Sequence, residues 1–135
     1  LQTGDTLPHP VETKEGKPIG VMSIEHIDWV NRTATTGAFI GEKEYWERGF
    51  GTDAKMILLD YAFNVLNLRK INSTVLVFNA RSLAYNKKCG YKEEGRRKKQ
   101  WYRGGRYVDE IMLGVFKGDF TPIFLEYMKS GRNSG

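Results

Sequence analysis

The most informative segment of the sequence reads Trp46-Glu47-Arg48-Gly49-Phe50-Gly51-Thr52, between a β-rich segment and one with helical spacing. Two glycines one residue apart allow a tight turn and the close approach of a ligand. The amides of Gly49, Gly51 and Thr52 are expected at the positive end of the helix, where they would bind a diphosphate, and Arg48 adds a charge. Alone the pattern is weak, because a tight turn without a ligand also explains it, and it is neither a P-loop nor a complete dinucleotide fingerprint.

The segment that follows this loop predicts a helix over residues 52–68, with Thr52 as its N-cap. Its apolar residues recur three and four positions apart, which predicts one buried face. That face consists of Ala54, Ile57, Leu58, Tyr61, Ala62, Val65 and Leu66. The polar residues Asp53, Lys55, Asp60 and Asn64 are expected on other faces of the helix.

The sequence before the loop predicts a β-meander. An edge strand is expected at residues 7–13, within an otherwise irregular stretch of 16 residues. Two further strands are expected at 19–27 and 33–40, with turns at 15–18 and 31–32. The continuous apolar run at 74–78 predicts a strand that is buried on both faces.

The second half of the chain predicts one short helix and a hairpin. Asn79 is expected to cap a helix over 80–88, which Gly90 ends. Two strands at 91–99 and 107–116 would meet around Arg103-Gly104-Gly105. A short helix or turn is expected at 121–129 and a disordered tail at 130–135. The order of elements predicts one α/β domain over residues 1–135.

Composition narrows the class of protein. The chain has 135 residues, 40% of them hydrophobic and 27% charged, which is typical of a soluble globular domain. Its apolar runs are far too short to cross a bilayer, and no secretory signal opens the chain. The single cysteine, Cys89, excludes an internal disulfide and gives no support for a zinc site. We therefore expect a cytoplasmic protein. The first residue is Leu1, for which a processed chain, a tagged chain and a fragment of a longer chain are the alternatives.

The positive charge is concentrated in one segment. The chain carries a net charge of +5, and residues 87–106 contain nine basic and two acidic residues. Such a patch attracts phosphate groups of a nucleic acid or of a cofactor. On charge alone, a solvated rim of strand and loop is the favoured explanation.

Several motifs in the same order and at the same spacing resemble the GNAT superfamily of N-acetyltransferases, in particular its ribosomal-protein and spermidine acetyltransferases. They are Ile40-Gly41, residues 45–54, 59–63, 68–71, 79–82 and 85–95, and Gly105 to Asp109. The resemblance covers about Lys17 to Phe116. It implies an α/β fold with a mixed, mostly antiparallel sheet, a central parallel pair of strands that splay apart, and flanking helices.

The resemblance also implies acetyl-CoA as co-substrate, with no metal. The diphosphate would lie on the backbone amides of Trp46, Glu47, Arg48, Gly49, Phe50, Gly51 and Thr52. The pantetheine arm would lie between the strands at 33–40 and 72–78. The acetyl end would contact Phe39, Ile40 and Gly41; the arm would meet Asn79, and the adenosine phosphates would meet Arg81 and Lys87.

Tyr85 matches the family's tyrosine that protonates the departing sulfur of CoA, and a phenol with a pKa near 10 suits that task. Glu25 matches an acidic position in the acceptor site, where it would attract a cationic amine or accept its proton through water. His26 would point to the opposite face of a regular strand. An aromatic ring packed under a helix explains Tyr85 as well, and ordinary polar side chains on the protein surface explain Glu25 and His26.

Two departures from the family pattern are visible. Trp46 stands where the family often has Gln or Arg, and the family's opening strand and two helices have no counterpart. These helices form a wall of the acceptor site, so another segment or subunit would supply it, or the site would be open. The expected partner is a small-molecule or peptide amine, with a homo-oligomer such as a dimer as a further expectation and no membrane partner.

Three functions therefore compete. The first is N-acetyl transfer from acetyl-CoA to a primary amine by direct attack. The second is a truncated module that binds CoA or a partner without turnover. The third is nucleic-acid binding through residues 87–106 with their aromatics, which we disfavour because it leaves the glycine loop unexplained.

Overall fold

The computed structural model describes residues 5–12, 18–40 and 50–130. Three strands come first: β1 (Asp5–Glu12), β2 (Pro18–Asp28) and β3 (Thr33–Ile40). They pair as an antiparallel meander with β1 at the edge, which confirms the predicted strands. The predicted tail after residue 130 and most of the predicted turn at 15–18 lie outside the described residues.

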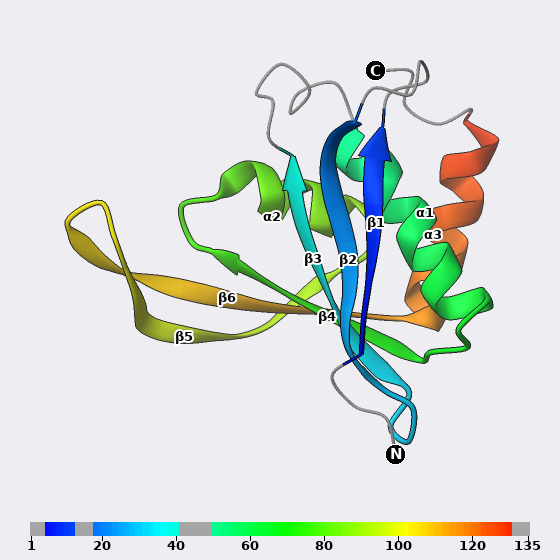
Figure 1. Cartoon of the computed structure of the whole chain (residues 1–135), viewed down its shortest axis with the longest axis horizontal. Coiled ribbons are helices and arrows are strands. Elements are labelled where there is room, and N and C mark those ends of the chain that lie inside the picture. The colour runs from blue at the N-terminus through cyan, green and yellow to red at the C-terminus, as the bar shows by residue number, and fades with distance from the viewer. Residues whose placement is uncertain (1–4, 13–17, 41–49, 131–135) are drawn as a thin grey trace.

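The remaining elements complete a mixed sheet covered by helices. They are α1 (Phe50–Asn64), β4 (Lys70–Leu76), α2 (Ala80–Lys88), β5 (Lys92–Arg103), β6 (Arg106–Phe116) and α3 (Lys117–Lys129). The sheet has the order β1-β2-β3-β4-β6-β5, and its only parallel pair among the described strands is β3–β4. Helices α1 and α3 lie side by side, while the β5–β6 hairpin extends away from them (Figure 1). The predicted fold class is confirmed.

Helix α1 differs from the predicted helix in its ends. It begins at Phe50, so Thr52 lies in the first turn and the prediction of an N-cap there was wrong. It ends at Asn64 instead of Leu68. Asn67 takes a left-handed backbone conformation with φ of 59°, which turns the chain out of the helix before β4.

The predicted buried face of α1 was right in part: Leu58 and Ala62 are buried, and Ala54, Tyr61 and Leu66 pack against the core. Ile57 and Val65 are exposed. The buried residues of this helix are Gly51, Thr52, Lys55, Met56, Leu58, Leu59, Ala62 and Phe63. The difference follows from a fully buried aromatic side chain of the helix: the Phe63 ring packs 5.3 Å from that of Phe120 in α3. Burying this aromatic contact also turns Lys55 inward.

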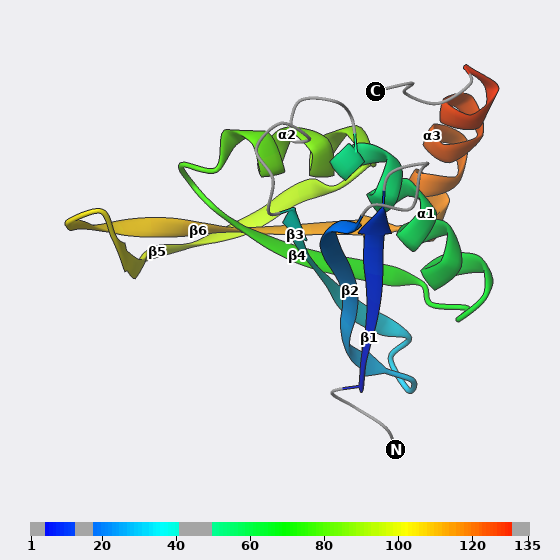
Figure 2. The same ribbon diagram turned by 45° about the horizontal axis from the view of Figure 1, so that its top comes forward.

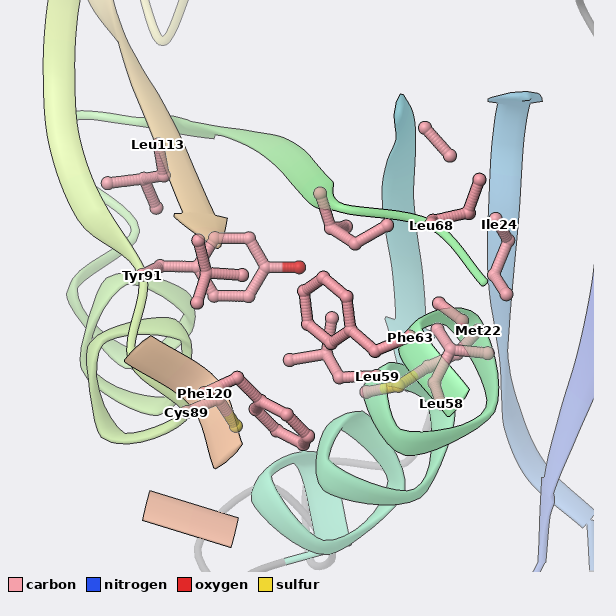
Figure 3. Packing of buried hydrophobic residues seen from close by; sticks show 14 of the residues in the cluster. Met22, Ile24, Leu58, Leu59, Phe63, Leu68, Cys89, Tyr91, Leu113 and Phe120 are labelled. Atoms are coloured by element: carbon pink, nitrogen blue, oxygen red, sulfur yellow. The ribbon is translucent and has the colours of Figure 1, made fainter. Parts of the chain in front are cut away.

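The core lies between the sheet and helices α1 and α3. Figure 3 shows Phe63 and Leu59 of α1 facing Tyr91 and Leu113 across this core, with Met22 and Ile24 of β2 on its other side. No helix in the described part of the chain is both long enough and apolar enough to span a membrane.

Strand β4 begins earlier in the sequence than the strand predicted at 74–78, and it is less buried than predicted. It covers Lys70–Leu76, and burial alternates along it, because only one face packs on the core. Val77 and Phe78 are exposed in a turn, closed by a hydrogen bond from the Asn79 amide to the Leu76 carbonyl at 2.9 Å.

Helix α2 is capped at both ends as predicted. The Asn79 side chain accepts a hydrogen bond from the Ser82 amide at 3.1 Å. Gly90 has φ of +105°, and the amides of Gly90 and Tyr91 bond back to the carbonyls of Lys87 and Asn86. This is the backbone pattern of a glycine-terminated helix.

The terminal elements are longer than predicted. The hairpin turn at Gly104 and Gly105 is confirmed by their positive φ angles, but β5 extends to Arg103 past an irregularity between Arg97 and Trp101. There the Lys99 amide donates to the Asp109 carboxylate at 2.9 Å. Helix α3 begins at Lys117 rather than near residue 121, because Phe120 packs into the core.

Candidate functional site

The sheet opens between its two central strands. Strands β3 and β4 pair in parallel at Thr33–Lys70, Ala34–Ile71 and Thr35–Asn72, and their register ends there. Strand β4 continues along β6 as far as Leu76. The two views show β3 and β4 diverging beyond the paired residues (Figures 1 and 2). Backbone groups on facing strands that do not pair are available to an amide-rich ligand.

Buried side chains bridge the strands where they part. The Ser73 hydroxyl of β4 donates to the Thr36 carbonyl of β3 at 3.3 Å. The Thr36 hydroxyl and the Tyr91 hydroxyl lie 2.7 Å apart. Figure 3 shows the Tyr91 ring in the core with its hydroxyl directed towards the meander strands. Hydrogen bonds from side chains, one to a backbone carbonyl and one to another side chain, thus replace part of the missing ladder and hold the opening in shape.

The first turn of α1 contacts the predicted catalytic tyrosine. A Cβ atom at Gly51 would lie 3.3 Å from Cδ2 of Tyr85, so only glycine lets this ring pack against the helix without displacement. Gly51 and Thr52 are buried. The first amides of a helix have no partner within it, which gives this turn the character of an anion site.

The environment of Tyr85 keeps its phenol protonated. Burial raises the pKa of Tyr85 and the neighbouring Cys89 raises it further, while a hydrogen bond with Ser82 opposes the rise. Tyr85 is therefore a neutral hydroxyl at physiological pH and a potential proton donor. Its role as an acid stays a prediction.

A lysine that the sequence pattern placed on a polar face lies in this region. Lys55 is 1% exposed, and its Nζ atom lies 5.8 Å from the ring centroid of Tyr85 and 5.3 Å from that of Tyr91. Burial lowers the pKa of Lys55 to about 8. Its spacing from Met56, Leu59 and Phe63 was the signal that would have found it.

Cys89 is a packed residue. Its side chain is fully buried, and the thiol lies 3.9 Å from the Thr52 carbonyl. Burial raises the pKa of Cys89 to about 12, against the opposing effect of Lys55 and Lys88. A thiol with so high a pKa is a poor nucleophile at neutral pH.

Glu25 lies on the sheet face opposite α1, since its neighbour Ile24 packs in the core beside that helix. The Ser23 hydroxyl donates to its carboxylate at 2.6 Å. On β3, a Cβ at Gly37 would lie 2.7 Å from Glu25 Oε2, so glycine makes room for the carboxylate. Ser23 and Gly37 were not predicted as parts of the site.

The prediction for His26 depended on a regular strand, and the strand is irregular. The β2–β3 register shifts between Glu25 and Asp28, and His26 has φ of 53°. His26 is exposed and the next residue, Ile27, is buried. Simple alternation therefore fails after Glu25.

The other predicted cofactor residues are distributed around α2 and β3. Asn79 is exposed before α2, with its side-chain oxygen engaged in the cap. Arg81 and Lys87 are exposed near opposite ends of α2, so the structure does not bring them together. Phe39 and Ile40 belong to the diverging end of β3, and Phe50 begins α1.

Part of the predicted site lies outside the described residues: Gly41, Trp46, Glu47, Arg48 and Gly49. Within the described ranges, no group of three or more His, Cys, Asp and Glu side chains is placed to hold a metal ion. The described site thus consists of the opening between β3 and β4, the start of α1, and Tyr85, with Glu25 on the other face.

This geometry matches a known family. Residues 4–92 match the family model of the acetyltransferase (GNAT) domain. The chain belongs to the GNAT family. The predicted family is thereby confirmed, and the relatives below include both enzyme types of the predicted branch.

Two GNAT relatives and one solved structure are similar over most of this chain. A spermidine N(1)-acetyltransferase of Vibrio cholerae is 32% identical over 110 residues, which cover 82% of this chain and 63% of the relative. The putative ribosomal N-acetyltransferase YdaF of Bacillus subtilis is 31% identical over 106 residues, covering 78% and 57%. The structure of the Vibrio cholerae enzyme with CoA and spermine has a TM-score of 0.79 at 28% identity, covering 86% and 68%.

The chain thus spans about three fifths of the length of these two curated relatives. The activities that their names state belong to these longer proteins as wholes. For this chain the activity is a proposal, which the geometry of its own residues supports.

Proposed function

We propose that the protein transfers the acetyl group of acetyl-CoA to a primary amine. The observation that carries this proposal is the opening between β3 and β4 beside the first turn of α1, with the protonated Tyr85 packed against that turn. Diverging strands offer backbone hydrogen bonds to an amide-rich arm, and the helix start favours a diphosphate. Both features suit CoA.

The residues present fit acetyl-CoA as co-substrate. Gly51 and Thr52, with Trp46, Glu47, Arg48, Gly49 and Phe50 before them, would hold the diphosphate. Phe39, Ile40 and Gly41 would line the acetyl end, Asn79 would contact the arm, and Arg81 and Lys87 would meet the outer phosphates. Acetyl-CoA supplies an activated thioester carbonyl, so no metal is required for the transfer.

Two side chains on opposite faces of the sheet, Glu25 and Tyr85, carry out the two proton transfers of the reaction. Glu25 attracts the cationic amine and takes its proton through water, which leaves a neutral nitrogen to attack the carbonyl. Tyr85 gives its phenolic proton to the sulfur as the carbon–sulfur bond breaks. The hydrogen bond from Ser23 holds the Glu25 carboxylate in place.

The amine class proposed first is a polyamine. The Vibrio cholerae relative is a spermidine acetyltransferase, and its solved complex contains spermine. Glu25 supplies the negative charge that such a cation needs. A peptide amine, an aminoglycoside and other small amines are the alternatives. A homo-oligomer and a cytoplasmic location also stay predictions.

Turnover is tested by release of free thiol from acetyl-CoA with a panel of spermidine, spermine, an aminoglycoside and a peptide with a free N-terminus. We expect thiol release with at least one amine, and polyamines as the best acceptors. If the protein binds CoA but releases no thiol with any amine of the panel, it is a CoA-binding module without turnover. Absence of CoA binding would contradict both the acetyltransferase and the CoA-binding module.

Cofactor binding is tested by Gly49→Glu, which places bulk and negative charge against the diphosphate. We expect calorimetry to detect no CoA binding by this variant. The matched control is Gly118→Glu in α3, where a Cβ meets no atom within 4 Å. Equal CoA affinity of both variants would contradict the proposed diphosphate site.

The acid role is tested by Tyr85→Phe. We expect kcat to fall by about 100-fold or more with little change in CoA affinity, because only the transition state needs the proton. Tyr102→Phe on the exposed hairpin is the control. An unchanged kcat in Tyr85→Phe would remove Tyr85 from the mechanism.

A further inference from the structure

Lys55 is a buried cation for which the proposed mechanism has no task. It lies on α1 one turn after Gly51, is 1% exposed, and is among the largest fully buried side chains of the described residues. Lysine is almost never fully buried unless it is paired. Its position beside the predicted acid therefore requires an explanation.

Within the described residues, no carboxylate balances the charge of Lys55 at neutral pH, because none lies within ion-pair distance of its ammonium. The titratable groups that face it are Tyr85 of α2, Cys89 at the end of α2, and Tyr91 before β5. Burial raises the pKa of each of these three groups above its ordinary value, so all three are neutral at pH 7.

Two aromatic rings are the neighbours that favour the charged form. The ammonium lies 5.8 Å from the centre of the Tyr85 ring and 5.3 Å from that of Tyr91. Ring faces attract cations, although much more weakly than a full negative charge does. Lys55 is thus a cation in a site of low dielectric. A negative charge on one of these two rings would stabilise it much more strongly than the neutral ring does.

The proposed reaction creates such an anion. Resting on the acetyl transfer proposed above, we propose that Lys55 is a positioning residue whose ammonium compensates the negative charge that Tyr85 acquires when its phenol protonates the departing sulfur. The Tyr91 and Thr36 hydroxyls share a hydrogen bond and Tyr91 is buried in the core, whereas Tyr85 is only partly buried and packs against the first turn of α1. Tyr85 is therefore the ring on which charge appears.

The protons and electron pairs balance in this step. The neutral amine nitrogen attacks the thioester carbonyl, and the electron pair of the carbon–sulfur bond goes to sulfur. The sulfur takes the Tyr85 proton, which leaves a phenolate beside the Lys55 ammonium. The proton lost by the new amide nitrogen restores the phenol through solvent, so Lys55 keeps its proton throughout. An interaction made only when charge develops accelerates the chemical step.

The test compares Lys55→Met with the wild type in thiol-release kinetics at saturating amine. We expect kcat at pH 7 to fall by about 10-fold or more, with CoA affinity within about 3-fold, because the lost charge interaction belongs to the transition state. Lys129→Met, at the exposed end of α3, is the matched control and should keep the wild-type kcat. Lys55→Gln is the second variant if the first does not fold.

A double variant separates this role from packing. If Lys55 acts through Tyr85, Lys55→Met has no further effect on kcat in the Tyr85→Phe background, whereas independent effects multiply. Multiplying effects, or a wild-type kcat in Lys55→Met, would overturn the inference while leaving the acetyl transfer intact.

The wild type provides a readout that needs no substitution. Because the pKa of Lys55 is about 8, kcat should decline above that pH, and the decline should be absent from Lys55→Met. A wild-type kcat that stays level to pH 9.5 would also overturn the inference. Failure of the wild type to release thiol with any amine would instead contradict the proposed function on which it rests.

Discussion

The two edges of strand β4 are built in different ways. Towards β6, the strand pairs at seven successive positions, from Lys70–Phe116 to Leu76–Glu110. Towards β3, pairing stops after three positions. The closed edge faces apolar residues of the core, such as Ile111 and Leu113, whereas the open edge has buried polar groups, such as Thr36 and Ser73.

This difference separates stability from function within one strand. The closed edge satisfies its backbone through the ladder and buries hydrocarbon, which is the main source of folding free energy. The open edge leaves backbone groups for a ligand and maintains its shape through side-chain hydrogen bonds. Substitutions at the two edges should therefore have different kinds of effect, and four predictions test this in order of decreasing size.

The largest effect is expected at the closed edge. Leu113→Ala should lower the free energy of unfolding by about 2–5 kcal/mol, because it opens a cavity in the packed core. Leu125→Ala, whose side chain is 61% exposed on α3, should change it by less than about 0.5 kcal/mol. Urea denaturation measures both, and similar effects of the two would contradict the assignment of stability to this edge.

The second prediction concerns the charge beside the open edge. The pKa of Lys55 falls from 10.5 to about 8 on folding. Between these values the unfolded chain binds more protons, so wild-type stability should rise with pH relative to Lys55→Met. Below pH 8, the buried charge of Lys55 lowers the free energy of unfolding of the wild type by its full amount, on the order of 3 kcal/mol. Lys55→Met should therefore be the more stable protein below pH 8.

Urea denaturation at pH 7, 8, 9 and 10 measures this difference, with Lys129→Met as a control that should show no such trend. A stability difference between the wild type and Lys55→Met that stays constant over this range would mean that Lys55 does not titrate as a buried group.

The third prediction concerns the hydrogen bond that holds the opening. Tyr91→Phe leaves the buried Thr36 hydroxyl without its partner and should cost about 1–3 kcal/mol in thermal or urea denaturation. Adding Thr36→Val to Tyr91→Phe should recover part of this loss, because both polar groups are then removed. No recovery would show that the bond is not the source of the effect. Tyr107→Phe on the exposed hairpin should be neutral.

The smallest effect is expected beyond the end of β4. Asn79→Ala removes the cap of α2 and should cost about 1 kcal/mol, whereas Asn79→Asp should keep most of the stability. Melting temperatures of the two variants check this. Equal losses in both would mean that the side-chain oxygen is not what stabilises the helix start.

Local signals in the sequence were enough for much of the fold. Asn79, Gly90 and Gly104-Gly105 set turns and caps through their own conformations, so their effects were predicted without knowledge of the tertiary structure. The family motifs then gave the parallel pair and its divergence. Strand β4 and the start of α3 were misplaced because burial, which only the assembled core determines, sets their ends.

The candidate site was predicted less completely. Tyr85 could be identified because a family motif surrounds it, and the structure places its ring against Gly51. Lys55 was missed, although its spacing from Leu59 and Phe63 is helical, because a lysine between apolar residues is normally expected to be solvent-exposed. The packing of Phe63 on Phe120 fixes the rotation of α1 that buries it. Ser23 and Gly37 were missed because their roles depend on the β2–β3 register, which brings them to Glu25.

Helix α2 serves as a spacer of fixed length. Asn79 sets its first turn and Gly90 its last, so Tyr85 reaches Gly51 only at one angle around the helix axis. Inserting or deleting one residue between Asn79 and Tyr85 would rotate the phenol by about 100°. Exchanges of exposed residues in this helix other than Arg81 and Lys87 should therefore be tolerated during evolution, whereas changes in its length should be eliminated.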